Sequence, residues 1–204
     1  MPGGGVTPFR EDDPCLSLFG SVWATGVVDW PQGAHVLEIG CAESDWMTPM
    51  LALRPDLQIT GIDWQDPGTR PGAVVRGDVL TVDWPDGTFD AAVGVSSIEH
   101  IGLGHYDHDP VDADGDTRCM ERVARWLKPG GVLYADVPYG RGFKVDRTSH
   151  RVYDDAALAS RLMVSGLRER CRWYGSDYAR ELRSTPEWNA RGLLYVALLA
   201  TKEC

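Results

Sequence analysis

The sequence predicts an α/β protein with a doubly wound sheet in three layers, in which mostly parallel strands are covered by helices on both faces. Segments with strand patterns alternate with segments of helical periodicity, which is typical of parallel sheets. Several predicted strands also end in polar side chains, at Glu38, Asp63, Asp78 and Ser96. Because doubly wound sheets bind ligands at the carboxyl ends of their strands, these residues mark the expected site.

The strands are predicted from short apolar or alternating runs bounded by turn residues. The run at 89–96 is the best candidate for a buried strand, because it is mostly apolar and follows the Asp86-Gly87 turn. The predicted parallel strands lie at about 35–39, 57–63, 73–76, 89–96 and 132–137. Two further runs, at about 167–173 and 193–201, are expected to close the sheet as an antiparallel pair.

Helices are predicted where apolar residues recur at helical spacing behind a capping residue. One is expected from about Ser44. A second ends at the Lys-Pro-Gly-Gly sequence of 128–131, with Asp116 as a candidate cap. A third runs from about 154 to 164, with Asp154 or Asp155 as its candidate cap.

The chain is expected to hold a flexible segment at 1–14, which is rich in glycine and proline, and a single domain at 15–204. An amphipathic helix over about 15–23 is expected either to pack on the domain or to cover its binding site. The long connection at 138–153 is basic and aromatic, and long loops of compact domains are often functional.

Composition excludes some partners. The formal net charge is −10, which disfavours a nucleic-acid substrate because phosphate binding needs a basic surface. The five cysteines show no CxxC spacing and indicate reduced thiols in a cytoplasmic protein. No apolar run approaches the length of a membrane span, so we expect no membrane association.

The turn after the first predicted strand indicates the ligand. It reads VLEIGCAESD over 36–45, and its small residues at Gly40 and Ala42 allow close approach of the backbone. A dinucleotide fingerprint needs glycines where this chain has Ala42 and Asp45, and it binds a pyrophosphate. The charges of Glu43 and Asp45 would repel that pyrophosphate. A cofactor without phosphate that carries a sulfonium and an ammonium group fits better, which predicts S-adenosylmethionine.

The sequence resembles the class I S-adenosylmethionine-dependent methyltransferases, which have a Rossmann-like fold. The resemblance covers about 36–201 and combines several short motifs in the expected order. The motifs are VLEIGCAES at 36–44, GID at 61–63, GDV at 77–79, PDGTFDAAV at 85–93 and LKPGG at 127–131.

The resemblance implies a role for each matching residue. Glu38 and the turn of Gly40, Cys41 and Ala42 would hold the methionine end of the cofactor. Asp63 would bind the ribose hydroxyls and Trp64 would pack on the adenine. The remaining predicted cofactor contacts are Gly77, Asp78 and Val79 at the adenine and Ser96 and Ser97 beside the sulfonium.

The second half of the site follows the fourth strand. His100 is the candidate general base, because it lies beyond the carboxyl end of that strand and titrates near neutrality; the alternative is a histidine bonded to nearby backbone. The predicted substrate contacts are Glu99, His105, Tyr106, Asp107, Tyr139 and His150.

A divalent metal is the less favoured alternative to the base. Glu99, His100 and His150 resemble the ligand set of a metal-dependent methyltransferase branch, in which a further Glu usually stands where this chain has Ser96. Asp107 or Asp109 would have to replace that ligand. A bound metal would lower the pKa of a substrate oxygen.

These observations together predict a methyltransferase that acts on an oxygen or nitrogen of a small molecule by in-line transfer. One alternative is an NAD-dependent oxidoreductase on the same architecture. The other is a binding module that holds S-adenosylmethionine without catalysis. The sequence leaves the acceptor and the oligomeric state open.

Overall fold

The computed structural model describes residues 30–42, 46–66, 68–104, 111–146, 149–175, 185–186 and 193–203. The predicted flexible segment at 1–14 and the amphipathic helix at 15–23 lie outside these residues. Among the described helices, none is long and apolar enough to cross a membrane.

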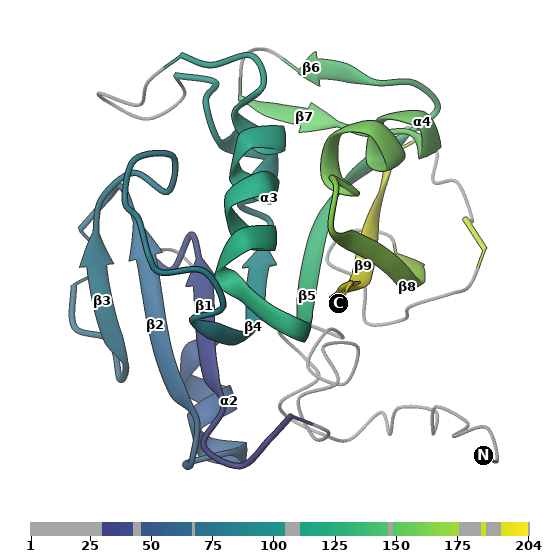
Figure 1. Ribbon diagram of the computed structural model, residues 1–204. Helices are drawn as coiled ribbons and strands as arrows, with labels where there is room; N and C mark the ends of the chain where they lie inside the picture. The colour runs from purple at the N-terminus through teal and green to yellow at the C-terminus, as the bar shows by residue number, and fades with distance from the viewer. Residues whose placement is uncertain are drawn as a thin grey trace, which may run out of the picture.

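Seven of the described strands form one sheet in the order β3-β2-β1-β4-β5-β9-β8 (Figure 1). The parallel strands are β1 (His35–Ile39), β2 (Gln58–Asp63), β3 (Ala73–Arg76), β4 (Phe89–Val95) and β5 (Leu127–Gly140). The last two are β8 (Leu167–Gly175) and β9 (Leu193–Lys202), with β9 antiparallel to both β5 and β8. The predicted mostly parallel sheet with an antiparallel C-terminal pair is confirmed.

Helices cover both faces of the sheet, which confirms the three layers. The helix α3 (Gly115–Trp126) and the consecutive short helices α4 (Asp155–Ala157) and η4 (Leu158–Leu162) pack on one face, and α2 (Met47–Leu53) packs on the other (Figure 1). Alternate residues of β1 supply the two cores: Leu37 and Ile39 pack on the α3 side, and Val36 packs on the α2 side. The burial of these apolar side chains stabilises the packing of the helices on both faces of the sheet.

The connection after β5 differs from the sequence prediction. The expected loop at 138–153 contains an antiparallel hairpin of β6 (Lys144–Asp146) and β7 (His150–Val152), and β5 itself continues to Gly140 beside β9. Each hairpin strand has only three residues, which is too short for a recognisable alternation. A 3-10 turn, η3 (Ile98–His100), follows β4.

The caps show one confirmed and one wrong prediction. Asp154 caps α4, because its Oδ1 accepts a hydrogen bond from the Ala157 amide at 2.8 Å. Asp116 is not the cap of α3. It lies inside the first turn of the helix, with 0% of its surface exposed, and Asp114 occupies the cap position.

The strand order reverses between β1 and β4, because β2 and β3 extend the sheet on one side and β4 and β5 on the other. In doubly wound sheets this reversal opens the ligand site at the carboxyl ends of the two central strands. Residues 40–42 and 96–100 therefore lie where a ligand is expected.

Candidate cofactor and methyl-transfer site

Gly40 occupies the point where the ends of β1 and β4 meet. Its φ is +78°, and its amide donates to the Ile62 carbonyl at 2.9 Å. A Cβ at this position would lie 2.2 Å from the Ser97 Oγ and 2.6 Å from the Ser97 Cβ. Both the backbone conformation and the contact with Ser97 therefore require glycine.

Asp63 ends β2 and holds the turn that follows β1. Its Oδ2 accepts from the Ala42 amide at 2.8 Å, and its Oδ1 accepts from the Gln65 amide at 2.8 Å. The Arg70 guanidinium donates to the Ala42 carbonyl. Each carboxylate oxygen can accept a second hydrogen bond, so Asp63 can position the turn and still bind a ligand hydroxyl.

The end of β1 is electronegative. Glu38 is 1% exposed. Burial raises the pKa of the neighbouring Cys41 thiol to about 12, and the carboxylates of Glu38 and Asp63 raise it further. Because the Cys41 side chain is buried, its predicted cofactor contact can come only from its backbone.

The residues predicted for the adenine end lie together at the ends of β2 and β3. The Gly77 amide donates to the Asp63 carbonyl at 2.8 Å, and the Asp78 Oδ1 accepts from the Leu80 amide at 2.8 Å. The Val79 side chain is buried in the core, which leaves its backbone for a ligand contact. Trp64 is half-buried and directly follows Asp63.

Ser96 links two acidic side chains beyond β4. It has a φ of +45°, an uncommon conformation for a residue other than glycine. Its amide donates to the Asp136 Oδ1 at 2.7 Å and its hydroxyl donates to the Glu99 Oε1 at 2.8 Å. The Ser97 hydroxyl donates to the Val95 carbonyl at 2.7 Å. Asp136 was not among the residues predicted for the site, although an acid within the apolar run of β5 is a signal that could have identified it.

The pKa values of both acids are shifted upward. Burial raises the pKa of Glu99 to about 8, and the nearby Asp136 carboxylate raises it further. Burial also raises the pKa of Asp136 to about 6. The hydrogen bonds from the Ser96 amide and from the Tyr134 hydroxyl, the latter at 3.0 Å, act in the opposite direction and lower this pKa. Such shifted carboxyl groups in one place are typical of functional sites.

His100 is positioned by the hairpin. Its Nδ1 lies 2.5 Å from the Ser149 carbonyl oxygen. Because a carbonyl only accepts hydrogen bonds, Nδ1 carries the proton of the neutral ring, and Nε2 is then the basic nitrogen. Nε2 lies 3.7 Å from the Glu99 Oε1. This arrangement suits a general base supported by a carboxyl group.

The other predicted substrate contacts are placed differently. The His150 ring centroid lies 6.1 Å from that of His100, so the two histidines are neighbours. Tyr139 is 5% exposed in the core, with its ring centroid 5.1 Å from that of Tyr174. The structure therefore does not bring Tyr139 to the surface of the site.

The predicted metal ligands Glu99, His100 and His150 are not assembled as a metal site. Within the described part of the chain, no group of three His, Cys, Asp or Glu side chains could hold a metal ion. His105, Tyr106, Asp107 and the alternative ligand Asp109 lie outside the described residues.

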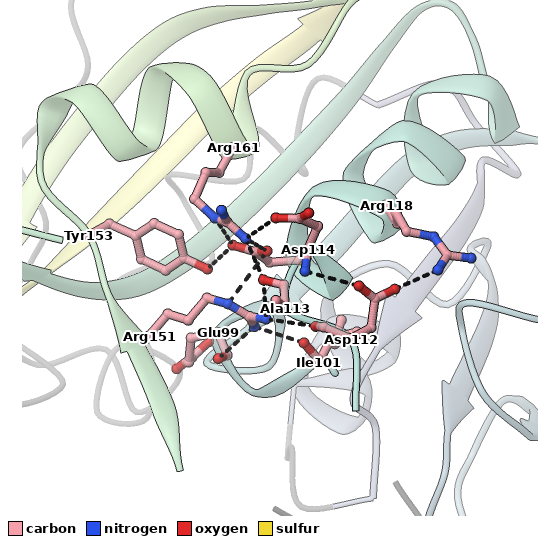
Figure 2. A network of polar contacts seen from close by, with 10 residues as sticks. Glu99, Ile101, Asp112, Ala113, Asp114, Arg118, Arg151, Tyr153 and Arg161 are labelled. Atoms are coloured by element: carbon pink, nitrogen blue, oxygen red, sulfur yellow. Dashed lines mark hydrogen bonds and ion pairs between the residues drawn. The ribbon is translucent and has the colours of Figure 1, made fainter. Parts of the chain in front are cut away.

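Arg151 fixes the segment that carries Glu99 and His100 (Figure 2). It is 1% exposed, and its guanidinium lies between β7, η3 and the start of α3. It donates to four backbone carbonyls, at 2.7–3.3 Å, those of Glu99, Ile101, Asp112 and Ala113. Arg151 was not among the residues predicted for the site, because its partners are distant in the sequence.

Asp116 supplies the opposing charge of this network. Its Oδ1 lies 3.5 Å from the Arg151 Nε. Its Oδ2 accepts from the Tyr153 hydroxyl and from the Arg161 Nε, both at 2.8 Å (Figure 2). The buried ion pairs hold the hairpin, α3 and η4 together behind the site.

The charge of the strand ends decides which ligand fits. Acidic side chains lie near or just beyond the carboxyl ends of four neighbouring strands, at Glu38, Asp63, Asp78 and Glu99. Asp136 lies within β5, opposite the last residue of β4, Val95. A pyrophosphate would be repelled by this edge, whereas a sulfonium and an ammonium group would be attracted. The donor set therefore fits S-adenosylmethionine.

The chain is similar in sequence to a protein-family model and in fold to solved structures. A family model described as Caenorhabditis protein of unknown function, DUF268, matches residues 81–185, which is more than half of the chain. No curated protein sequence matches the chain significantly.

Solved structures similar to the chain include S-adenosylmethionine-dependent enzymes. The 1,6-didemethyltoxoflavin-N1-methyltransferase of Burkholderia thailandensis, solved with its substrate and S-adenosylhomocysteine, is 17% identical over 95% of this chain and 80% of its own, with a TM-score of 0.67. An O-methyltransferase of a Brevibacillus brevis multienzyme, bound to S-adenosylhomocysteine, is 14% identical over 83% of this chain and 67% of its own, with a TM-score of 0.61.

A third similar structure is that of a protein named for a different reaction. The cyclase SpnF is 21% identical over 87% of this chain and 78% of its own, with a TM-score of 0.62. At these identities the similarity shows the fold of class I methyltransferases. A shared fold does not determine the reaction, which depends on the residues of the site.

Proposed function

The chain belongs to the DUF268 family, and we propose that it is an S-adenosylmethionine-dependent methyltransferase acting on an oxygen or nitrogen nucleophile of a small molecule. The observation that carries this proposal is the acidic edge around the Gly40 turn. Glu38 is buried there, and Asp63 holds the Ala42 amide at 2.8 Å. The methyltransferase fold of the similar structures supports the proposal.

Each part of the site has a task in this proposal. Glu38 and the turn of Gly40, Cys41 and Ala42 bind the methionine end of the cofactor. Asp63 accepts hydrogen bonds from the ribose hydroxyls. The adenine contacts the residues predicted for it, which are Trp64, Gly77, Asp78 and Val79. When bound, S-adenosylmethionine supplies a methyl group activated by a sulfonium leaving group.

His100 acts as the base for the acceptor. Its Nδ1 is held by the Ser149 carbonyl, so Nε2 can take a proton from a hydroxyl or amine nucleophile. The Glu99 Oε1, at 3.7 Å, stabilises the imidazolium that forms. Ser96 and Ser97 line the sulfonium side of the cofactor, on which the methyl group is transferred. The protein must also align the nucleophile with that methyl group and exclude water.

The acceptor is proposed to be a small molecule in the cytoplasm. The net charge of −10 disfavours nucleic acid and an anionic membrane surface. The substrate region is then formed by Glu99, by His150 and by the segment of His105, Tyr106 and Asp107.

An activity screen tests the proposal. The protein is incubated with methyl-labelled S-adenosylmethionine and fractionated metabolite pools, with and without a chelator. We expect a labelled product and S-adenosylhomocysteine, insensitive to the chelator and reduced at least about a hundredfold in H100A, the usual range for a general base. Cofactor binding without any product, together with no effect of H100A, would instead identify a non-catalytic binding module. Loss of activity with the chelator would restore the metal alternative.

A further inference from the structure

Glu99 and Asp136 form a pair of acids that share Ser96, which we call the acidic pair. The Ser96 amide binds Asp136 and its hydroxyl binds Glu99, at 2.7 Å and 2.8 Å. Glu99 is 1% exposed, whereas Asp136 is only partly buried. A ligand can therefore reach the pair from the side of Asp136.

The hydrogen bonds of the acidic pair are incomplete. The Glu99 Oε2 is buried, and no described residue donates a hydrogen bond to it. The Oδ2 of Asp136 accepts from the Tyr134 hydroxyl at 3.0 Å. A buried carboxylate oxygen without a donor is costly, and native proteins usually provide a partner for it. The Oε2 of Glu99 is therefore the atom for which a ligand donor is expected.

Neither Arg151 nor His100 donates a hydrogen bond to the Glu99 Oε2. Arg151 contacts the backbone carbonyl of Glu99 and ion-pairs with Asp116 (Figure 2). His100 uses its Nδ1 for the Ser149 carbonyl, and its Nε2 lies 3.7 Å from the Glu99 Oε1. Glu99 and Asp136 therefore lie close enough for the charge of Asp136 to disfavour ionisation of Glu99. Their hydrogen-bond donors are the Ser96 amide, the Ser96 hydroxyl and the Tyr134 hydroxyl.

We propose that the acidic pair binds the amino group of the methyl acceptor, so that the enzyme methylates an amine and not an alcohol. This inference rests on the proposed function. An ammonium group brings a positive charge and several donors, one of which can reach the Glu99 Oε2, whereas an alcohol brings one donor and no charge. The position of the pair beyond β4, beside His100, places that amine next to the proposed base.

The proton that such an acceptor must lose can be taken up by a residue already described, His100. The acceptor binds as an ammonium ion and loses one proton to the His100 Nε2, which leaves a neutral amine with a free lone pair. That lone pair forms a bond between the amine nitrogen and the methyl carbon of S-adenosylmethionine. The bond between this carbon and the sulfur breaks, and the sulfur keeps the electron pair, which gives S-adenosylhomocysteine. The product is a methylated ammonium ion, which the acidic pair again stabilises.

The experiment compares amines with alcohols of the same skeleton, using propylamine with propanol and benzylamine with benzyl alcohol. Each probe is titrated into protein labelled with carboxyl ¹³C-glutamate and ¹³C-aspartate and saturated with S-adenosylhomocysteine. The Glu99 and Asp136 carboxyl signals are assigned from E99Q and D136N. The control is E121Q, which removes an exposed carboxylate of α3 by the same substitution.

The amines are expected to move the Glu99 and Asp136 signals towards the ionised form and to bind at least about tenfold more tightly than the alcohols, in the wild type and in E121Q. E99Q and D136N, checked for folding by melting and by binding of S-adenosylhomocysteine, should lose this preference. Amines that leave both carboxyl signals unmoved, or alcohols that move them equally, would overturn the inference. If S-adenosylhomocysteine itself does not bind, the proposed function fails instead, so the two failures are distinct.

Discussion

Removing the Asp116 carboxylate by D116A is expected to destabilise the protein severely. Asp116 is 0% exposed, and it faces Arg161 at 2.6 Å and the buried Arg151 at 3.5 Å. Without it, Arg151 stays 1% exposed beside four carbonyl dipoles and has lost its anion. Breaking a buried pair in this way typically costs about 3–5 kcal/mol, a large part of the roughly 5–15 kcal/mol that stabilises a domain.

The matched control is D114A at the cap position of the same helix, where the Asp114 side chain makes no cap hydrogen bond. Asp114 also pairs with Arg161, at 3.2 Å, but its side chain is 69% exposed. Such exposed pairs contribute about 0–1 kcal/mol. Urea unfolding should therefore show a large loss for D116A and a small one for D114A. In a chain of this size the melting temperature of D116A should fall by roughly 6–20 °C. Equal losses for the two variants would refute the buried-network reasoning.

Three further predictions concern the site. Calorimetry should show that G40A loses binding of S-adenosylhomocysteine, because its Cβ would lie 2.2 Å from the Ser97 Oγ. The control G33A should keep this binding, because Gly33 also has a positive φ, of +70°, but a Cβ there would have nothing within 4 Å. Equal binding by the two variants would contradict the steric account. The free energy of unfolding should fall as pH rises from about 5 to about 8, because folding raises the pKa of Glu99 from 4.5 to about 8 and the folded state then binds more protons than the unfolded state. E99Q should flatten this part of the pH profile, and an unchanged slope would show that Glu99 is ionised in the folded protein. In ¹⁵N-histidine spectra, His100 should carry its proton on Nδ1, and a neutral ring protonated on Nε2 would argue against its role as a base.

The sheet was predictable because its strands carry local signals. The apolar run of β4 and the acid-ended β2 are recognised without knowledge of their neighbours, and parallel strands bring their carboxyl ends to one edge. Glu38 and Asp63 could therefore be assigned to one site from the sequence alone, since Asp63 ends β2 and Glu38 lies one residue before the end of β1.

The supporting residues could not be predicted in this way. Arg151 follows a histidine in a short, polar hairpin and resembles a solvated residue, and its carbonyl partners lie 38–52 positions away in the sequence. The two hairpin strands are also too short for a recognisable alternation, and the apolar Val145 of β6 remains 45% exposed. The link between Glu99 and Asp136 depends on the left-handed conformation of Ser96, which only tertiary contacts impose.

Calorimetric titration of the wild-type chain with S-adenosylmethionine, S-adenosylhomocysteine and NADH tests the central claim most directly. We predict saturable binding of the first two and none of NADH. The double variant E38Q/D63N should bind at least about tenfold more weakly, while E121Q binds like the wild type. Absence of heat with both adenosyl ligands, or tight binding of NADH, would contradict the account.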